Sequence, residues 1–463
     1  MNSLLIPGPP HGLALRYRGG RSGSSSPGRG GFAPRTLGPG GRLWTGLAFL
    51  WAAYFFLVFS LARYEAYTQR IIWTVGPVVA LLTVVAWIGR SSRIPAEVWL
   101  LTCFAGWCLV ALPRVTNLPA FTSWWKLVAE MVVLVWCIST VLRNSSGMHW
   151  FYVAFLGAGV FNVLLGVDFI GGLAEAVDSL GNQERQGGIS GGTNALGFYC
   201  FMGILGGLAL LGEWRSKLLR TVLLVGCGIC LYGVAGAASK GAFLLTVLAV
   251  VLWPVLCFRE QLRRRLTVLV PAGVAALIVV VGLPWIMENT FLGARLERAR
   301  HLEEGSTQAR LELLMLGLKL FGEHPVTGVG LGQFAVESGL GRYTHNEWAE
   351  LLSNTGLVGF LLYLGAYAVL WHRLTQVLQR CRNPRVRYHA NFGRLIVLLL
   401  LLSGMVFRPN FLSIESMFLI AVAVGTGQWV ELRCRLEWPG APGVRADTRR
   451  PRTLTRPGVP TPA

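Results

Sequence analysis

Apolar runs long enough to cross a membrane recur along most of this chain, and short polar links separate them. A stretch of roughly 20 apolar residues is the length at which an α-helix crosses the hydrocarbon of a bilayer. With 53% hydrophobic and 14% charged residues, the 463 residues are too apolar for a soluble domain. The sequence therefore predicts an all-α polytopic membrane protein.

We predict about twelve spanning helices from these runs. They cover residues 44–62, 71–89, 96–112, 124–142, 149–171, 194–212, 218–236, 241–258, 267–287, 346–371, 394–407 and 413–431. A transmembrane domain over 44–432 would then lie between two basic tails, 1–43 and 433–463. We expect no cleavable signal peptide, because the first apolar run follows some forty Gly-, Pro- and Arg-rich residues that we expect to be disordered.

The net charge of +20 would suit nucleic-acid binding, but its distribution argues against that function. Arginines gather in both tails and in the even-numbered connections, while the short odd-numbered connections carry few. Under the positive-inside rule both termini are cytoplasmic, and the basic tails act as topology signals that also meet anionic lipid. Two longer connections, near 172–193 and 288–345, then lie on the outer face, the larger one between the ninth and tenth helices.

The residues that usually hold metals are scattered. The cysteines, among them Cys227 and Cys230, lie within apolar runs, which indicates packing rather than redox or zinc chemistry. Aspartate occurs only at Asp168, Asp178 and Asp447, so no Asp-x-Asp pair can bind a divalent cation. We expect chemistry without a metal.

Two cations on the outer face are candidates for anion binding. Arg185 begins the segment R-Q-G-G-I-S-G-G-T-N-A-L-G, where a guanidinium beside a Gly-rich turn and a helix start suits a phosphate; a solvated loop arginine is the alternative. Lys240 lies in the short link A-A-S-K-G-A-F, as a phosphate ligand or a lysine snorkelling to the interface. The glycines that follow Arg185, at 197, 203 and 207, share one helical face and permit close helix packing.

The large outer connection contains a predicted short helix over 307–321, too short to span and therefore expected at the interface, with Leu311, Leu314 and Leu318 on one side. Arg310 would sit in its first turn, where a cation opposes the helix dipole, so anion binding is the better explanation for it. The following G-V-G-L-G lacks the preceding strand of a dinucleotide loop and predicts a tight turn back to the membrane.

His345 and Asn346 open the next predicted span and precede Glu347 and Trp348. Taken singly, an interfacial histidine is usually structural, and Trp348 could belong to an aromatic belt. A neutral imidazole can also accept a proton near pH 7, which makes His345 a candidate base.

Together these pieces resemble the O-antigen ligase family and the related O-antigen polymerases. The resemblance rests on H-N-E-W-A-E-L-L-S-N-T-G-L-V-G-F, on H-P-V-T-G-V-G-L-G-Q-F before it, and on the arginine some fifteen residues upstream. The segment R-Q-G-G-I-S-G-G-T-N-A-L-G and the A-S-K-G-A turn extend it, so that it covers roughly residues 180–365. Lys240 departs from the family pattern, which more often has arginine there, and a lysine would contact phosphate as a point charge.

The resemblance implies an integral bacterial inner-membrane glycosyltransferase of surface polysaccharide or lipopolysaccharide assembly. It would transfer a glycan from undecaprenyl pyrophosphate to an acceptor hydroxyl, such as one on lipid A core, at the periplasmic face. The outer face has no nucleotide supply, so the activated lipid would provide the driving force and no soluble cofactor would be needed. His345 would be the base; Arg310, Lys240 and Arg185 would bind the pyrophosphate, with Arg310 also acting in catalysis. Asn346 or Glu347 would orient the histidine, although Glu347 could simply be solvated.

Other functions remain open at this point. The acceptor could be another lipid-linked unit, as in a polymerase, or a protein serine or threonine. A transporter of lipid-linked glycan would also have many helices, but it would more usually bury ionisable residues at mid-span, where Glu130 is almost the only clear candidate. A structural assembly partner would not require the arginine and the histidine together.

Overall fold

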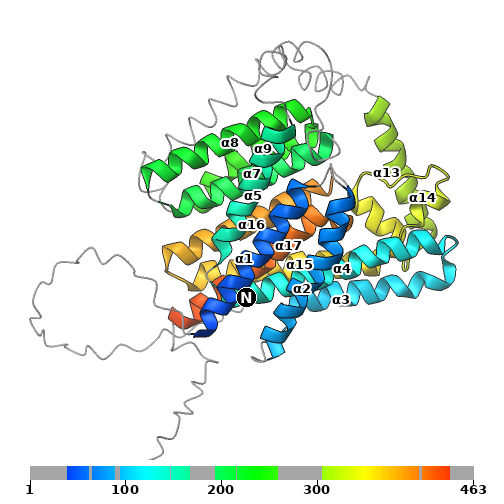
Figure 1. Cartoon of the computed structure of the whole chain (residues 1–463). Coiled ribbons are helices and arrows are strands. Elements are labelled where there is room, and N and C mark those ends of the chain that lie inside the picture. The colour runs from blue at the N-terminus through cyan, green and yellow to red at the C-terminus, as the bar shows by residue number, and fades with distance from the viewer. Residues whose placement is uncertain are drawn as a thin grey trace, which may run out of the picture. The chain divides into compact units, whose positions relative to one another are not determined.

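Figure 1 shows the computed structural model of the chain. It describes residues 39–61, 65–88, 94–145, 147–166, 193–214, 216–258, 305–405 and 409–437. Every regular element in these ranges is helical, and 11 of the helices are long and apolar enough to cross a membrane. The all-α, multi-pass membrane architecture predicted from the sequence is confirmed.

The candidate spans are α1 (Pro39–Ser60), α2 (Glu65–Ile88), α3 (Ala96–Cys108) with its continuation η1 (Leu109–Arg114), α4 (Leu118–Asn144), α5 (Met148–Gly166), α7 (Thr193–Glu213), α8 (Lys217–Ala237), α9 (Lys240–Cys257), α15 (Glu347–Arg380), α16 (Pro384–Ser403) and α17 (Ile414–Glu437). Shorter elements are α13 (Gly305–Glu323), α14 (Phe334–Glu337) and η4 (Asn410–Leu412).

Each predicted span except one coincides with one of these helices. The exception, 267–287, lies outside the described residues, as do residues 1–38 and 438–463 of the predicted tails. The same holds for nearly all of the predicted outer connection 172–193 and for the first part of the larger one, up to residue 304. The remaining tail residues, 39–43 and 433–437, belong to α1 and α17.

Asparagine caps fix where several helices begin. Asn117, Asn346 and Asn383 each accept backbone N–H groups of the helix that follows, which would otherwise lack partners. Pro384 occupies the first position of α16, where a missing N–H costs nothing. The chain therefore enters α4, α15 and α16 at defined residues.

Burial separates central helices from peripheral ones. The most apolar windows of α7 and α17 are 83% buried, whereas that of α2 is 11% buried, so α7 and α17 form the centre and α2 faces outward. Glycines allow the close packing around α7: a Cβ at Gly203 or Gly207 would overlap the Cys230 or Cys227 sulfur. The predicted roles of these glycines and cysteines in helix packing are confirmed.

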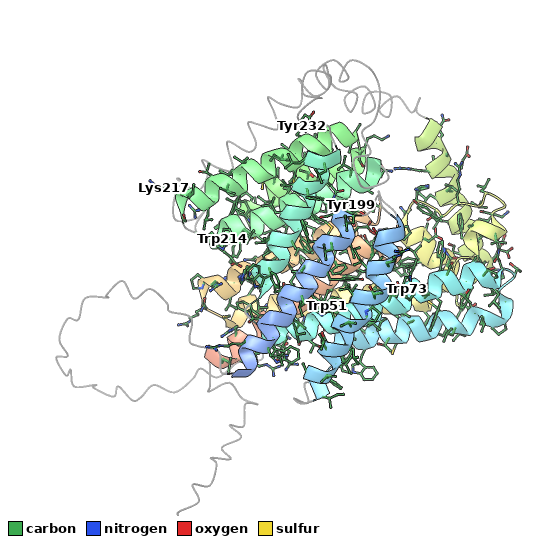
Figure 2. All side chains as sticks on the ribbon, in the orientation of Figure 1. Trp51, Trp73, Tyr199, Trp214, Lys217 and Tyr232 are labelled. Atoms are coloured by element: carbon green, nitrogen blue, oxygen red, sulfur yellow. The ribbon has the colours of Figure 1, made fainter. Side chains whose placement is uncertain are left out.

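His345 lies at one end of the helical bundle, which we call the outer end; the opposite end is the inner end. Contacts place the starts of α7, α9, α15 and α17 together at the outer end. The Tyr199 hydroxyl of α7 donates to Glu415 of α17 at 3.1 Å, and Gly197 lies against Ser239, the residue before α9. Asn410, just before α17, donates to Glu347 of α15 at 2.7 Å. Trp214 and Lys217, where α7 ends and α8 begins, mark the inner end (Figure 2). The positive-inside pattern predicts that the outer end faces the periplasm.

Candidate functional site

Helix α13 packs on α15 at the outer end (Figure 1). Leu313 and Leu320 form a small core with Val329 and Phe334, which follow in the chain. The predicted helix is confirmed, but its leucine stripe points outward: Leu311 is 58% exposed and lies on the face away from this core. That exposed apolar face agrees with the predicted interfacial position.

The glycine-rich segment after α13 forms a loop that docks onto a break in α15. Gly356 has φ 63° and ψ −170°, so the helix is interrupted between Thr355 and Leu357. Gly328, Gly330 and Gly332 also have positive φ, as a tight loop requires. The predicted turn is confirmed; it follows a helix rather than a strand, as expected if it is not a dinucleotide loop.

The break leaves backbone carbonyls of α15 without helical partners, and three N–H groups from elsewhere in the chain donate to them. Val329 N–H donates to Ser353 O at 2.9 Å, and Gly330 N–H donates to Asn354 O at 3.0 Å. The Trp107 indole of α3 donates to Thr355 O at 2.9 Å. Irregular backbone at membrane depth is tolerated only where protein buries and satisfies it, and the loop and α3 meet that requirement here.

The Leu357 N–H, on the other side of the break, donates to Pro325 O at 2.8 Å. Backbone contact is so close that a Cβ at Gly328 would overlap the Asn354 carbonyl carbon, and one at Gly356 would overlap Val326. The loop at residues 328–332 and the break at Gly356 therefore form one unit that fixes the start of α15.

His345 lies in the turn that immediately precedes α15 and adopts φ 56°, in the left-handed region. The turn is held on both sides: Thr344 N–H donates to the Glu350 carboxylate at 2.6 Å, and the Thr344 hydroxyl donates to Asn346 O at 2.6 Å. Left-handed backbone in a residue other than glycine costs roughly 1–2 kcal/mol and persists where surrounding contacts enforce it. The structure thus presents His345 in a fixed, strained turn.

Arg310 of α13 and Arg342 lie near His345. Partial burial, followed by the charges of Arg310 and then Arg342, lowers the pKa of His345 below its ordinary 6.5. The Tyr343 ring lies against the imidazole, with ring centroids 4.2 Å apart. Because α13 begins at Gly305, Arg310 occupies its second turn rather than the predicted first, so its charge opposes the helix dipole less than expected.

The sequence suggested that Glu347 either orients His345 or is solvated, and the structure shows another environment. It is fully buried, so it is not solvated, and it accepts from the Tyr363 hydroxyl at 2.8 Å and the Asn410 side chain at 2.7 Å. Its own N–H donates to Gly404 O at 2.6 Å. Glu347 therefore ties the connection between α16 and α17 to α15.

Asn346 caps α15, accepting from Trp348 and Ala349 N–H at 3.0 and 3.1 Å. Lys240 is half-buried at the first position of α9, which begins at the outer end. The structure brings His345, Asn346 and Arg310 into one site and places Lys240 at the same end of the bundle. Arg185 lies outside the described residues.

Three buried polar residues that build this site were not predicted from the sequence. Glu350 holds Thr344 and accepts from the Asn354 amide at 2.7 Å, and the Asn354 oxygen accepts from Phe334 N–H at 3.0 Å. Gln333 anchors the link between η1 and α4, accepting from Asn117 N–H at 2.9 Å. A signal existed: Asn346, Glu350 and Asn354 recur every four residues, so these polar residues lie on one face at the start of α15.

In the part of the chain that the structure describes, no three His, Cys, Asp or Glu side chains gather as a metal site would require. The expectation of chemistry without a metal stays a prediction.

The family model described as O-antigen ligase matches residues 225–364, which confirms the resemblance over that segment. Members of the family are glycosyltransferase-like enzymes. The matched segment contains Lys240, Arg310 and His345 and lies downstream of Arg185. No curated protein matches the chain.

Proposed function

Because residues 225–364 match the O-antigen ligase family, we propose that the chain transfers a glycan from undecaprenyl pyrophosphate to an acceptor hydroxyl at the periplasmic face of the inner membrane. The acceptor is a glycolipid such as lipid A core, as in an O-antigen ligase. The observation that carries this proposal is the position of His345 at the outer end of the bundle, in a turn held by the Glu350 carboxylate and near the charge of Arg310.

His345 would act as the base. A base must be deprotonated before reaction, and the lowered pKa of His345 keeps its imidazole neutral at pH 7. As the acceptor oxygen attacks the anomeric carbon, its proton moves to the imidazole. The bond from that carbon to the pyrophosphate oxygen breaks, and undecaprenyl pyrophosphate departs.

The leaving pyrophosphate gains negative charge, which fixed cations can stabilise. Arg310 is positioned for this role by α13, and its closeness to His345 puts acid–base and anion-binding groups in one site. Lys240 begins α9 at the same end, where the starts of α7, α9, α15 and α17 also present their positive dipole ends. Arg185 would be a third cation that binds the pyrophosphate, a role that rests on its sequence context alone.

The position of charge also favours transfer over transport. The ionisable pair within the span of α4, Lys126 and Glu130, lies at 3.7 Å on one helix, with the two side chains 49% and 36% exposed. A translocation path would place such groups in the bundle interior. Among the described residues, buried carboxylates lie instead near the two ends of the bundle: Glu347 and Glu350 follow the turn of His345, and Glu97 and Glu213 lie at the inner end.

The test is glycan transfer by purified protein with a lipid-linked donor. His345→Ala should lower the transfer rate by about 10²- to 10⁴-fold, the usual contribution of a general base, and Arg310→Gln should also impair it. The matched control is His324→Ala, a half-buried histidine at the end of α13. Full transfer by His345→Ala would contradict the proposal, and an intact donor moved across the membrane would identify a transporter.

A strain that lacks the protein separates the two enzymatic alternatives. Loss of a ligase leaves long glycan on the carrier lipid, whereas loss of a polymerase leaves single repeat units. Glycan missing from protein serine or threonine would identify a protein O-oligosaccharyltransferase instead.

A further inference from the structure

The segment between α14 and α15 carries an arginine that the proposed function does not use. Arg342 lies three residues before His345 and is exposed. Partial burial, then Arg310 and then Arg342 lower the pKa of this imidazole. A cation at this place also opposes the imidazolium that forms when His345 takes the proton of the acceptor. An anion bound to Arg342 would remove that opposition during transfer.

The backbone on both sides of Arg342 is fixed. Before it, the Gly341 N–H donates to Ala335 O at 3.0 Å. After it, the Thr344 N–H donates to the Glu350 carboxylate at 2.6 Å. These two anchors enclose a short segment that contains the arginine and leads directly into the turn of the base. The structure therefore presents Arg342 from the same held segment as the imidazole.

The space beside this segment is open. A Cβ added at Gly339 or Gly341 would meet no atom of the described residues within 4 Å. Leu340, between them, is 54% exposed. A substrate that approaches His345 from this side can therefore reach the Arg342 guanidinium without displacing the described part of the chain.

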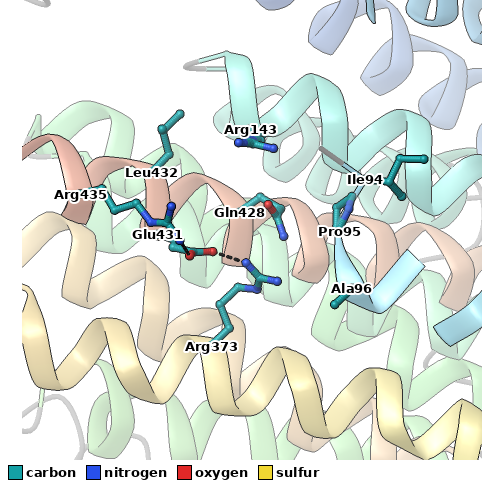
Figure 3. Close-up of a pocket in the computed structure, with 9 residues that line it drawn as sticks. All are labelled: Ile94, Pro95, Ala96, Arg143, Arg373, Gln428, Glu431, Leu432 and Arg435. Carbon is teal, nitrogen blue, oxygen red and sulfur yellow. Dashed lines mark hydrogen bonds and ion pairs between the residues drawn. The ribbon is translucent and has the colours of Figure 1, made fainter. Parts of the chain in front are cut away.

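The guanidinium of Arg342 has no carboxylate partner among the residues that the structure describes. Arginines at the inner end differ in this respect. Beside the cavity drawn in Figure 3, Glu431 forms ion pairs with both Arg373 and Arg435. Because no described acid pairs with Arg342, its positive charge can bind an anion that belongs to a substrate.

The proposed reaction has two substrates, and its direction of attack indicates which of them meets Arg342. In a single displacement, the acceptor oxygen attacks the anomeric carbon from the face opposite to the leaving oxygen. The base therefore works on the acceptor side of the sugar ring. Arg342 precedes the base in one segment and would lie on that side, whereas Arg310 reaches the site from a separate helix, α13.

We propose that Arg342 binds a phosphate group of the acceptor and so selects acceptors that carry a phosphate near the reacting hydroxyl. This inference rests on the proposed function, and it gives the acceptor a chemical class that the family match leaves open. A guanidinium suits the role, because its planar fork can donate two parallel hydrogen bonds to one phosphate. The bound phosphate also balances the charge of Arg342 while the His345 imidazolium forms.

Steady-state transfer kinetics of the purified full chain test this role, with lipid A core as the acceptor, either phosphorylated or treated with a phosphatase. Rates are measured above the acidic limb of the pH profile, so that His345 is neutral in every protein. Arg342→Gln should raise the KM for the phosphorylated acceptor by about tenfold, the loss of one charge-assisted hydrogen bond. Both kcat and the KM for the lipid-linked donor should change little.

Two further variants serve as controls. Arg342→Lys keeps the charge without the fork, so its KM for the phosphorylated acceptor should lie between those of the unmodified protein and Arg342→Gln. Lys319→Gln removes an exposed cation of α13 and should change neither KM. With the phosphatase-treated acceptor, the unmodified protein should have a raised KM, and Arg342→Gln should raise it no further.

An unchanged KM for the phosphorylated acceptor in Arg342→Gln overturns the proposal, and so does an equal loss with both acceptors. If the variant raises the KM for the donor instead, Arg342 serves the pyrophosphate and the acceptor assignment is wrong. Absence of transfer by the unmodified protein to either acceptor is a different result, because it contradicts the proposed ligase function and this inference with it.

Discussion

The Glu350 carboxylate accepts the backbone N–H of Thr344 at 2.6 Å, one residue before His345. The same carboxylate accepts from Asn354 at 2.7 Å, and Asn354 in turn accepts from Phe334 of the glycine-loop region. One fully buried acid therefore joins the turn that presents His345 to the loop that docks on α15.

We predict that Glu350→Ala lowers kcat with little change in KM, because the variant loses the contact that holds His345 in position. It should also destabilise the protein, since a buried N–H left without a partner costs about 1–3 kcal/mol. Transfer kinetics and thermal unfolding in detergent measure the two effects. Glu323→Ala, an exposed acid at the end of α13, is the control; unchanged kcat in folded Glu350→Ala would show that the contact does not position the base.

The rate of transfer should rise with pH and level off, with the acidic limb below pH 6.5, because His345 must be neutral to accept a proton and its pKa is lowered. Removing a neighbouring positive charge makes the imidazolium less unfavourable, so Arg342→Gln should move the limb to higher pH. Arg342→Lys retains the charge and should leave the limb in place. If the unmodified protein and the two Arg342 variants show the same pH–rate profile, the acidic limb does not report protonation of His345.

Gly356→Ala should destabilise the protein more than Gly339→Ala. Both glycines have positive φ, 63° and 68°, so alanine strains the backbone by roughly 1–2 kcal/mol at each. Only at Gly356 does the added Cβ also overlap the backbone of Val326, whereas nothing lies within 4 Å at Gly339. Thermal unfolding measures the difference, and equal losses would mean that the loop does not dock on the break as described.

Glu347 and Asn410 should show energetic coupling, because the Asn410 side-chain amide donates to the Glu347 carboxylate at 2.7 Å inside the protein. In a double-mutant cycle with Glu347→Ala and Asn410→Ala, we expect the second change to cost less once the first is made, with an interaction of about 0.5–3 kcal/mol. Free energies of unfolding from all four proteins give the coupling. Additive losses would show that each residue acts through other partners.

Much of the fold follows from the apolar runs of the sequence. A helix that spans a membrane makes its backbone hydrogen bonds within itself, so its residues form one continuous apolar run. The same property hid the break in α15: Gly356 lies within an apolar run, and the sequence predicted one uninterrupted span over 346–371. The break is stable because Val329, Gly330 and Trp107 bond to the freed carbonyls. Those partners come from other parts of the chain, and the apolar pattern of α15 itself gives no information about them.

The candidate site was predictable to the extent that its residues are close in sequence. His345, Asn346 and Glu347 are consecutive, and Arg310 precedes a turn that the glycines made recognisable. The environment of Glu347 was not predictable, because Asn410, its main partner, lies 63 residues away along the chain. Glu347, which the sequence allowed to be solvated, is buried and joins α15 to the connection after α16.

The docking of residues 328–332 on α15 also decides how this protein could be recombined with a relative. The loop donates its hydrogen bonds to backbone carbonyls of Ser353 and Asn354, and two glycines, one on each side, make room for the contact. A chimaera that exchanges the loop alone would combine a loop and a helix from different proteins, whose backbones need not fit these close contacts and hydrogen bonds. The smallest portable cassette therefore runs from α13 through the break at Gly356.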